Sequence, residues 1–186
     1  MVAAFIYCWS FNPAFGTPLF FEYTRGLKLS QNLIGQANAS YSFGMLVGAF
    51  VYPIIWKYTP KHQIKIAIAL SVTSTLSFLL LDSSNFFMLE FLRGVSGMLG
   101  ILCINWLAAG VSPKGLETFA TATLIGVYNI GTQTSGIIGA HLYSNVFHNS
   151  INPLLLIASS VTATCFLIQI LFSRHTFKYD QDSESK

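Results

Sequence analysis

Charged residues are scarce in this sequence. They make up 9% of its 186 residues, whereas hydrophobic residues make up 53%. An average soluble domain carries about 25% charged residues, so this chain has too few to cover a water-facing surface. Its apolar residues gather in runs close to the roughly 20 residues that a helix needs to cross about 30 Å of hydrocarbon. The composition therefore excludes an ordinary soluble domain and predicts an all-α, multi-pass integral membrane protein.

Cysteine pairs and metal-ligand spacings are absent too. The sequence has three cysteines and four histidines, namely Cys8, Cys103, Cys165, His62, His141, His148 and His175. Each cysteine stands alone in an apolar run, without CxxC spacing, and is expected to pack as a small core residue. The histidines show neither metal-ligand spacing nor a paired carboxylate. The sequence therefore predicts no metal, no cofactor and no enzyme, because it contains no nucleophile–base set.

Six apolar runs, separated by polar turns, predict six transmembrane helices. They cover residues 2–23, 33–56, 64–81, 86–111, 116–146 and 151–172. The first run lacks the basic start and the small-residue cleavage site of a signal peptide, so it is expected to remain as a span. Ser30 and the Ser112–Pro113 pair are typical of the residues that begin helices.

The basic residues are distributed unevenly between the predicted turns. Seven lie on one side, namely Lys57, Lys61, Lys65, Lys114, Arg174, Lys178 and Lys186, and two lie on the other, namely Arg25 and Lys28. They do not form one patch with interleaved aromatic residues, so nucleic acid is not an expected partner. Because Lys and Arg favour cytoplasmic loops, both termini are predicted to be cytoplasmic. Residues 1–174 form the predicted membrane domain, and the polar residues 175–186 are expected to be a disordered cytoplasmic tail.

The second and fifth predicted spans share the pattern G-x2-N-x9-G-A-x2-Y. The two copies are Gly35, Asn38, Gly48, Ala49, Tyr52 and Gly126, Asn129, Gly139, Ala140, Tyr143, displaced by 91 residues. The displacement equals three spans, an odd number of crossings, so the copies cross the membrane in opposite directions. Inverted repeats of this kind are typical of secondary transporters, whose substrate site lies near mid-membrane. The sequence thus predicts two inverted three-helix repeats, at about residues 1–82 and 83–174.

Glu90 and Arg93 are the charged pair placed well inside a predicted span. They lie at i and i+3 on one helix face. Charges inside a membrane are costly and usually face a cavity or each other. In a functional interpretation, Glu90 exchanges a proton and Arg93 binds an anionic group such as a carboxylate. In a structural interpretation, the two residues form an ion pair near the outer boundary of the membrane.

Polar residues and prolines occur together in the first predicted span. Tyr7, Ser10 and Asn12 are candidates to line a substrate path, and they precede Pro13 and Pro18. A proline kinks a helix and frees backbone carbonyls, which serve as a hinge or as hydrogen-bond acceptors. Many membrane helices contain prolines without any moving part, and this alternative stays open.

Two amides lie halfway along the fifth predicted span. Asn129 and Gln133 share one helix face at a depth where an unpaired amide costs several kcal/mol, so they are expected to face protein or a water-filled path. Asn38 is the counterpart of Asn129 in the repeat, and a helix-tying hydrogen bond is the structural alternative for both. Small residues are expected to let helices pack closely, namely Gly35, Gly48, Gly126, Gly136 and Gly139.

Two segments resemble a known family. The stretch "PKGLETFATATLIGVYNIGTQTSGIIGA" resembles the P-x-G-x-E segment and the Asn-Gly helix of folate-biopterin transporters, a branch of the major facilitator superfamily. The stretch "FNPAFGTPLFFEYTRGLKLSQNLIGQANASYSFGMLVGAFVY" resembles the seventh and eighth helices of the same family. Pro113, Gly115 and Glu117 are the motif residues here, and they are expected to cap or gate a cytoplasmic turn.

The resemblance implies the C-terminal six-helix half of a carrier that normally has twelve helices. The first and fourth helices, 2–23 and 86–111, would line the path of a folate- or pterin-like anion that is moved by alternating access, with proton coupling as one version. A homodimer or a separate N-terminal six-helix half would complete the path within the lipid bilayer. Two alternatives stay open: a carrier for another small solute, and a membrane interaction subunit or remnant of a split carrier that transports nothing.

Overall fold

The computed structural model describes residues 2–58, 62–112 and 115–183, with their side chains except at 111 and 170–183. These residues form helices and helical turns, and no strand occurs among them. The α-helices are α1 (Val2–Ser10), α2 (Thr17–Phe21), α3 (Gln31–Tyr58), α4 (Gln63–Ser77), α5 (Phe86–Val111), α6 (Glu117–His141) and α7 (Asn152–Ser183). The short turns are η1 (Glu22–Gly26), η2 (Phe78–Leu80) and η3 (Leu142–Val146). The predicted all-helical fold is confirmed.

The first predicted span is broken rather than kinked. α1 ends at Ser10, α2 begins at Thr17, and residues 11–16 form no helix. Pro13 lies in this break, where its missing N–H prevents α1 from continuing. Gly16 has a φ of +92°, which residues with a side chain rarely adopt. Pro18 follows in the first turn of α2, where proline is favoured. The expectation of one continuous helix is therefore corrected.

Four described helices are long and apolar enough to cross a membrane. They are Gln31–Tyr58, Gln63–Leu80, Phe86–Gly110 and Asn152–Gln169. The first predicted span is divided into short pieces, and the fifth, which corresponds to α6 and η3, is interrupted by polar residues. The chain is thus an all-α protein with membrane-type helices, and six spans remain a prediction.

The last helix is longer than predicted. α7 continues to Ser183, although a disordered tail was expected from residue 175 onward. No glycine or proline follows the apolar part of this helix to end it. Residues 184–186 of the expected tail lie outside the described residues.

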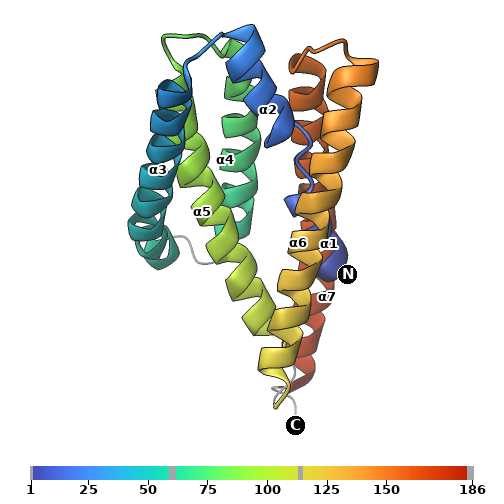
Figure 1. Cartoon of the computed structure of the whole chain (residues 1–186). Coiled ribbons are helices and arrows are strands. Elements are labelled where there is room, and N and C mark those ends of the chain that lie inside the picture. Colours follow the sequence, from blue (N-terminus) through green and yellow to red (C-terminus); the bar gives the residue numbers. More distant parts are fainter. Residues whose placement is uncertain (1, 59–61, 113–114, 184–186) are drawn as a thin grey trace.

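The helices form two groups that meet along α4 and α7. Figure 1 shows α3, α4 and α5 on one side and α1, α6 and α7 on the other, with α2 between them near one end. α3 packs along α5, α6 packs along α1, and α4 contacts α7. At their lower ends in this view, α5 and α6 converge, whereas their upper parts are apart. The space between the groups is where the cavity described below is found.

Glycines set the closest helix contacts on both sides. A Cβ at Gly94 of α5 would collide with the carbonyl oxygen of Tyr41, and one at Gly44 of α3 would collide with that of Phe91. A Cβ at Gly48 would lie 2.8 Å from the carbonyl oxygen of Val95. Close approach of two helix backbones through small residues is typical of membrane helix packing. α3 and α5 therefore form a tightly packed pair.

On the other side, α6 packs against the end of α1 and against the break through its own glycines. A Cβ at Gly139 would collide with the carbonyl oxygen of Pro13, and one at Gly131 would collide with the hydroxyl of Ser10. By contrast, a Cβ at Gly35, Gly126 or Gly136 would meet nothing within 4 Å. Gly48 and Gly139 thus lie at close contacts, and the other three predicted packing glycines face open space.

Candidate functional site

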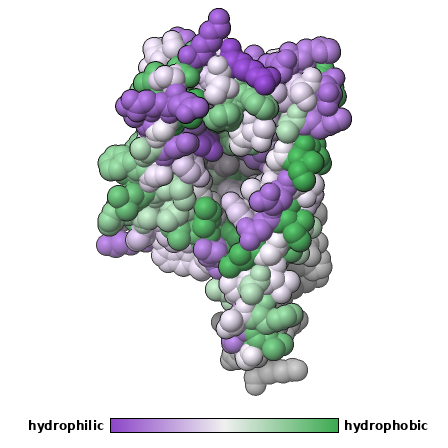
Figure 2. Space-filling view, viewed as in Figure 1, coloured by the Kyte–Doolittle hydropathy of each residue, from purple (hydrophilic) through white to green (hydrophobic). Residues whose placement is uncertain are grey.

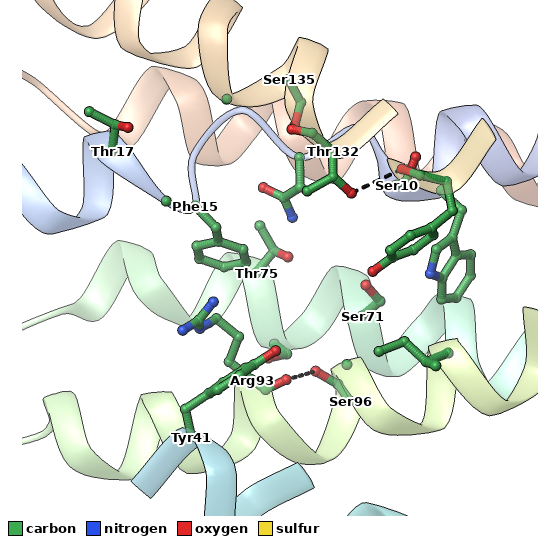
Figure 3. Close-up of a pocket in the computed structure, with 18 residues that line it drawn as sticks. Ser10, Phe15, Thr17, Tyr41, Ser71, Thr75, Arg93, Ser96, Thr132 and Ser135 are labelled. Carbon is green, nitrogen blue, oxygen red and sulfur yellow. Dashed lines mark hydrogen bonds between the residues drawn. The ribbon is translucent and has the colours of Figure 1, made fainter. Parts of the chain in front are cut away.

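A polar cavity of about 350 Å³ lies between the two groups of helices. Its walls come from the break, from both flanking helices and from α3, α4, α5 and α6. The lining residues are Trp9, Ser10, Asn12, Phe15, Gly16, Thr17, Tyr41, Ser71, Ser74, Thr75, Arg93, Ser96, Gly97, Ile101, Tyr128, Thr132, Ser135 and Gly136. Figure 2 shows the surface hollowed near the middle of this face, and Figure 3 shows the labelled side chains converging from several helices.

Arg93 is held at the cavity wall by Glu90. Its Nε and Nη2 donate to Oε2 of Glu90 over 2.8 and 2.6 Å. The hydroxyl of Tyr23 donates to the other carboxylate oxygen over 2.7 Å. Glu90 is 1% exposed, whereas the side chain of Arg93 is 20% exposed and lines the cavity. The carboxylate thus lies behind the guanidinium, and only the guanidinium faces the space where a ligand would bind.

Two aromatic rings flank the guanidinium. Its Cζ lies 4.1 Å from the ring centroid of Tyr41 and 4.9 Å from that of Phe15. Cation–π contacts of this kind are favourable within about 6 Å. Phe15 comes from the break and Tyr41 from α3, so Arg93 of α5 is contacted by both sides of the cavity (Figure 3). Nη1 makes no hydrogen bond to another described residue, and it is free to donate to an anion.

Hydroxyl groups supply most of the remaining polar surface. Ser96 donates to the carbonyl of Arg93 over 3.1 Å, Ser135 to that of Thr132 over 2.9 Å, and Ser10 to that of Tyr7 over 3.0 Å. These hydroxyls are satisfied by their own helices, yet each retains lone pairs that accept hydrogen bonds. The cavity can therefore accommodate a polar molecule with an anionic group at Arg93.

The comparison with known families decides the class of protein. The sequence pattern of the BT1 family matches residues 2–185. The chain belongs to the BT1 family. This is the family of folate-biopterin transporters related to the major facilitator superfamily, so the resemblance noted in the sequence is confirmed. Neither a curated protein nor a solved structure matches the chain.

Membership in the BT1 family indicates a transporter of the major facilitator type. The apolar helices agree with an integral membrane location. Transporters commonly bind substrates where a transmembrane helix is interrupted, because irregular backbone is tolerated in the membrane only beside a cavity or within protein. In this BT1 chain the interrupted segment is residues 11–16, and three of its residues, Asn12, Phe15 and Gly16, line the cavity.

The structure brings some of the predicted path residues to the cavity and leaves others outside it. Ser10, Asn12 and Arg93 line it, and Glu90 lies directly behind Arg93. Tyr7 does not line it; its carbonyl accepts hydrogen bonds from Ser10 and from the N–H of Phe11, and its side chain is half-buried.

The predicted amides of α3 and α6 lie at the surface of the chain. Asn38, Asn129 and Gln133 are all exposed. Asn129 lines a separate cavity of about 260 Å³ beside Asn105 and Tyr128. Within the part of the chain that is described, protein does not cover these amides, and the polar cavity does not include them.

The turn before α6 can be described from Gly115 onward, and Pro113 lies outside the described residues. Gly115 has a φ of +85°, and its N–H lies 2.9 Å from each carboxylate oxygen of Glu117. Hydrogen bonds from the backbone N–H groups of Glu117 itself and of Gly115 lower the pKa of the Glu117 carboxyl. Glu117 therefore orders this turn, and it lies far along α6 from the cavity-lining residues.

Several lining residues were not predicted from the sequence. Ser71, Ser74 and Thr75 share one face of α4, at positions i, i+3 and i+4. That spacing was a usable signal. Tyr23 does not line the cavity but bonds Glu90 behind its wall. The sequence does not indicate this contact, because Glu90 is 67 residues away.

Proposed function

We propose that the chain is a secondary active transporter that binds a small organic anion at Arg93 and moves it by alternating access. The observation that supports this most is the guanidinium at the cavity wall, beside the break in the first predicted span. A planar guanidinium is suited to binding a carboxylate through two N–H donors. The BT1 family supports a folate- or pterin-like anion as the substrate.

The Glu90–Arg93 pair supports proton coupling as the more specific version. When Glu90 is ionised it neutralises Arg93 and occupies two of its donors. A proton on Glu90 removes that charge, so Arg93 can bind the anionic group of the substrate instead. Proton and anion would then bind together and leave together, which is the coupling that uptake requires.

The helix contacts support two inverted three-helix repeats as half of a major facilitator fold. In such a repeat, the second helix is equivalent to the fifth and the first is equivalent to the fourth. The α3–α5 contact should then correspond to a contact between α6 and α1, and these are the two pairs that pack through glycine. Gly48 and Gly139, equivalent in the sequence repeat, lie at close contacts in both pairs.

A second six-helix unit would complete the transporter. Large apolar side chains are exposed on α3 and α6, among them Phe50, Phe119 and Ile137. Asn129 and Gln133 are exposed beside them, and amides facing hydrocarbon would be unfavourable. We propose that a second copy of the chain or a separate N-terminal half covers these faces. Both termini would be cytoplasmic, as the distribution of Lys and Arg indicates.

A carrier for a different small anion is the alternative function. The cavity presents an arginine and many hydroxyls, and this surface would also suit anions that have no pterin ring. Competition distinguishes the two functions: an excess of unlabelled folate or biopterin should suppress uptake of the labelled compound, whereas unrelated carboxylates should not.

The test is uptake of labelled folate, which carries carboxylates, into vesicles that contain the chain, with and without an inward proton gradient. Arg93→Gln should lower uptake by about 10- to 100-fold, because a charge-assisted hydrogen bond to the anion is lost. Glu90→Gln should abolish the stimulation by protons. Arg25→Gln is the charge-matched control, since Arg25 is exposed and lies over Phe21 outside the cavity. Uptake by Arg93→Gln at the level of the unchanged chain would exclude Arg93 as the anion site.

A further inference from the structure

The carboxylate of Glu90 receives its hydrogen bonds from two segments of the chain. Glu90 is 1% exposed, and its Oε2 accepts from Arg93 on the same helix. Its Oε1 accepts from the hydroxyl of Tyr23 over 2.7 Å, and Tyr23 belongs to η1, 67 residues earlier in the chain. The set of donors around Glu90 is therefore completed by a residue that follows the break of the first predicted span.

The ring of Tyr23 is packed against α5. Tyr23 is 3% exposed, and its ring lies edge-on to that of Phe86, with 6.1 Å between the ring centroids. Tyr23, Phe86 and Leu89 belong to one buried hydrophobic cluster. Because Phe86 lies one helical turn before Glu90, this packing directs the hydroxyl of Tyr23 to the carboxylate and leaves it little freedom to turn away.

The other titratable and charged groups near this end of the molecule make different contacts. The ring of Tyr41, on α3, faces the guanidinium of Arg93, and Asp82 accepts from two serine hydroxyls of its own turn. Within the described residues, Glu90 takes its side-chain hydrogen bonds from Tyr23 and Arg93. The remaining groups contact residues other than Glu90 or are exposed, namely Glu22, Arg25, Lys28, His141, Tyr143 and His148.

We propose that Tyr23 is a positioning residue that keeps Glu90 ionised and bonded to Arg93 while η1 packs against α5. This inference rests on the proposed function, in which Glu90 exchanges the coupling proton. A hydrogen bond donated to a carboxylate favours its charged form, so the donor makes protonation less favourable. Glu90 takes up its proton more readily once η1, and with it the broken span, moves away from α5. Tyr23 thereby links the position of the broken span to the step that frees Arg93.

A second tyrosine provides a matched comparison. Tyr143 has the same place in η3 that Tyr23 has in η1: each is the second residue of its turn, and its carbonyl accepts the N–H of the residue six positions later over 2.8 Å. Tyr143 is 1% exposed, and its hydroxyl donates to Oε2 of Glu22 over 3.3 Å. It is thus an equally buried tyrosine that donates to a carboxylate other than Glu90.

The first experiment measures folate uptake into vesicles that contain the full chain, as a function of the external pH. Tyr23→Phe keeps the ring that packs on Phe86 and removes the hydroxyl. Half-maximal stimulation by protons should then need about a tenfold lower proton concentration, which is about one pH unit higher, because a hydrogen bond to the charged carboxylate is lost. Tyr143→Phe should leave the pH profile unchanged. If Tyr23 had only a structural role, uptake would fall at every pH without a shift of the profile.

The second experiment detects the proton on Glu90 without any transport. An infrared titration of the purified full chain in lipid nanodiscs follows the carboxylic acid absorption that Glu90→Gln removes. The midpoint of this absorption should move up by about one pH unit in Tyr23→Phe. It should stay where it is in Tyr143→Phe, since that hydroxyl bonds Glu22.

The outcomes separate this inference from the proposed function. If the infrared midpoint does not move in Tyr23→Phe, if Tyr143→Phe moves it as far, or if Glu90→Gln removes no such absorption, the role assigned to Tyr23 is wrong. Proton-stimulated folate uptake by the unchanged chain would still support the proposed function in the first two cases. If the unchanged chain takes up no folate, the proposed function fails, whereas a midpoint that moves in Tyr23→Phe alone would still establish that Tyr23 keeps Glu90 ionised.

Discussion

The α3–α5 pair and the α1–α6 pair pack in the same way but differ in what they enclose. In both, glycines of one helix lie against backbone carbonyls of the other. α3 and α5 are long continuous helices, so Gly44, Gly48 and Gly94 bring two helical backbones together. On the other side, Gly139 of α6 lies against Pro13, which belongs to the non-helical residues 11–16 between α1 and α2.

This difference shows that close packing of glycines against backbone carbonyls can hold two helices together and can also position the residues of a cavity. In the continuous pair the backbone groups near these glycines are bonded within their own helices, so they are not available to a ligand. A broken partner keeps the close contact at Pro13, while its other residues, such as Asn12 and Phe15, line the cavity. The intact pair contributes Arg93 to the opposite wall, where its position is fixed by Glu90. The intact pair thus supplies the charged group of the cavity, and the break supplies part of the opposite wall.

The largest effect is expected for Gly94→Ala in the continuous pair. The new Cβ would collide with the carbonyl oxygen of Tyr41, which belongs to a helix backbone and cannot turn aside. Overpacking of this kind should lower the free energy of unfolding by about 3 kcal/mol. An SDS unfolding titration in mixed micelles measures it. Gly35→Ala is the control, because its Cβ meets nothing within 4 Å and a helical alanine should stabilise by up to about 1 kcal/mol.

A smaller effect is expected for Gly139→Ala in the broken pair. Its Cβ would collide with the carbonyl oxygen of Pro13, but the non-helical residues 11–16 can shift at lower cost than a helix. We expect a loss of about 1–2 kcal/mol in the same titration, together with weaker binding of folate, since the break lines the cavity. A loss of stability as large as that of Gly94→Ala would mean that residues 11–16 yield no more easily than a helix. The proposed difference between the two helix pairs would then be wrong.

A third substitution tests the conformation of the break without adding a contact. Gly16 has a φ of +92°, and a Cβ there would meet nothing within 4 Å. Gly16→Ala should therefore destabilise by about 1–2 kcal/mol through backbone strain alone. Gly126→Ala, equally free of contacts but inside α6, should not destabilise. Equal results for the two variants would show that the φ of Gly16 is not required by the fold.

Much of the fold could be predicted because its signals are local. α3, α4, α5 and α6 begin and end within a few residues of the second to fifth apolar runs, since turn residues and run lengths lie in the sequence itself. The first run is broken instead, and α7 extends beyond the last run. Glu90 and Arg93 were found because charges are conspicuous in an apolar helix. The BT1 family was indicated by two short segments, and the match over residues 2–185 confirms it.

The remaining features depend on contacts that the sequence does not display. Two prolines in one span indicate a kink or a break equally well, and the positive φ of Gly16 is what makes it a break. The hydrogen bond from Tyr23 to Glu90 joins residues far apart in the chain. Asn129 and Gln133 are expected to face protein or a water-filled path; in the structure both are exposed, and Asn129 lines a cavity separate from the one beside Arg93. The sequence of a polar helix face does not indicate which other helix or cavity that face contacts.

The smallest effect on stability is expected for Glu117, at the start of α6. It tests whether the contact with Pro13 in the break or the turn at Gly115 and Glu117 sets the position of α6. The pKa of Glu117 is lowered below its usual 4.5 by backbone N–H groups that bond the carboxylate. The ionised form is therefore favoured by folding, so its stabilisation is present above pH 4.5 and is lost as the pH falls through the lowered value. Thermal unfolding between pH 6 and 3 should show this loss in the unchanged chain and less of it in Glu117→Gln. Because Glu117 is fully exposed and does not line the cavity, the variant should keep its affinity for folate. A weakened affinity would instead show that the turn, and not Pro13, fixes α6 against the cavity.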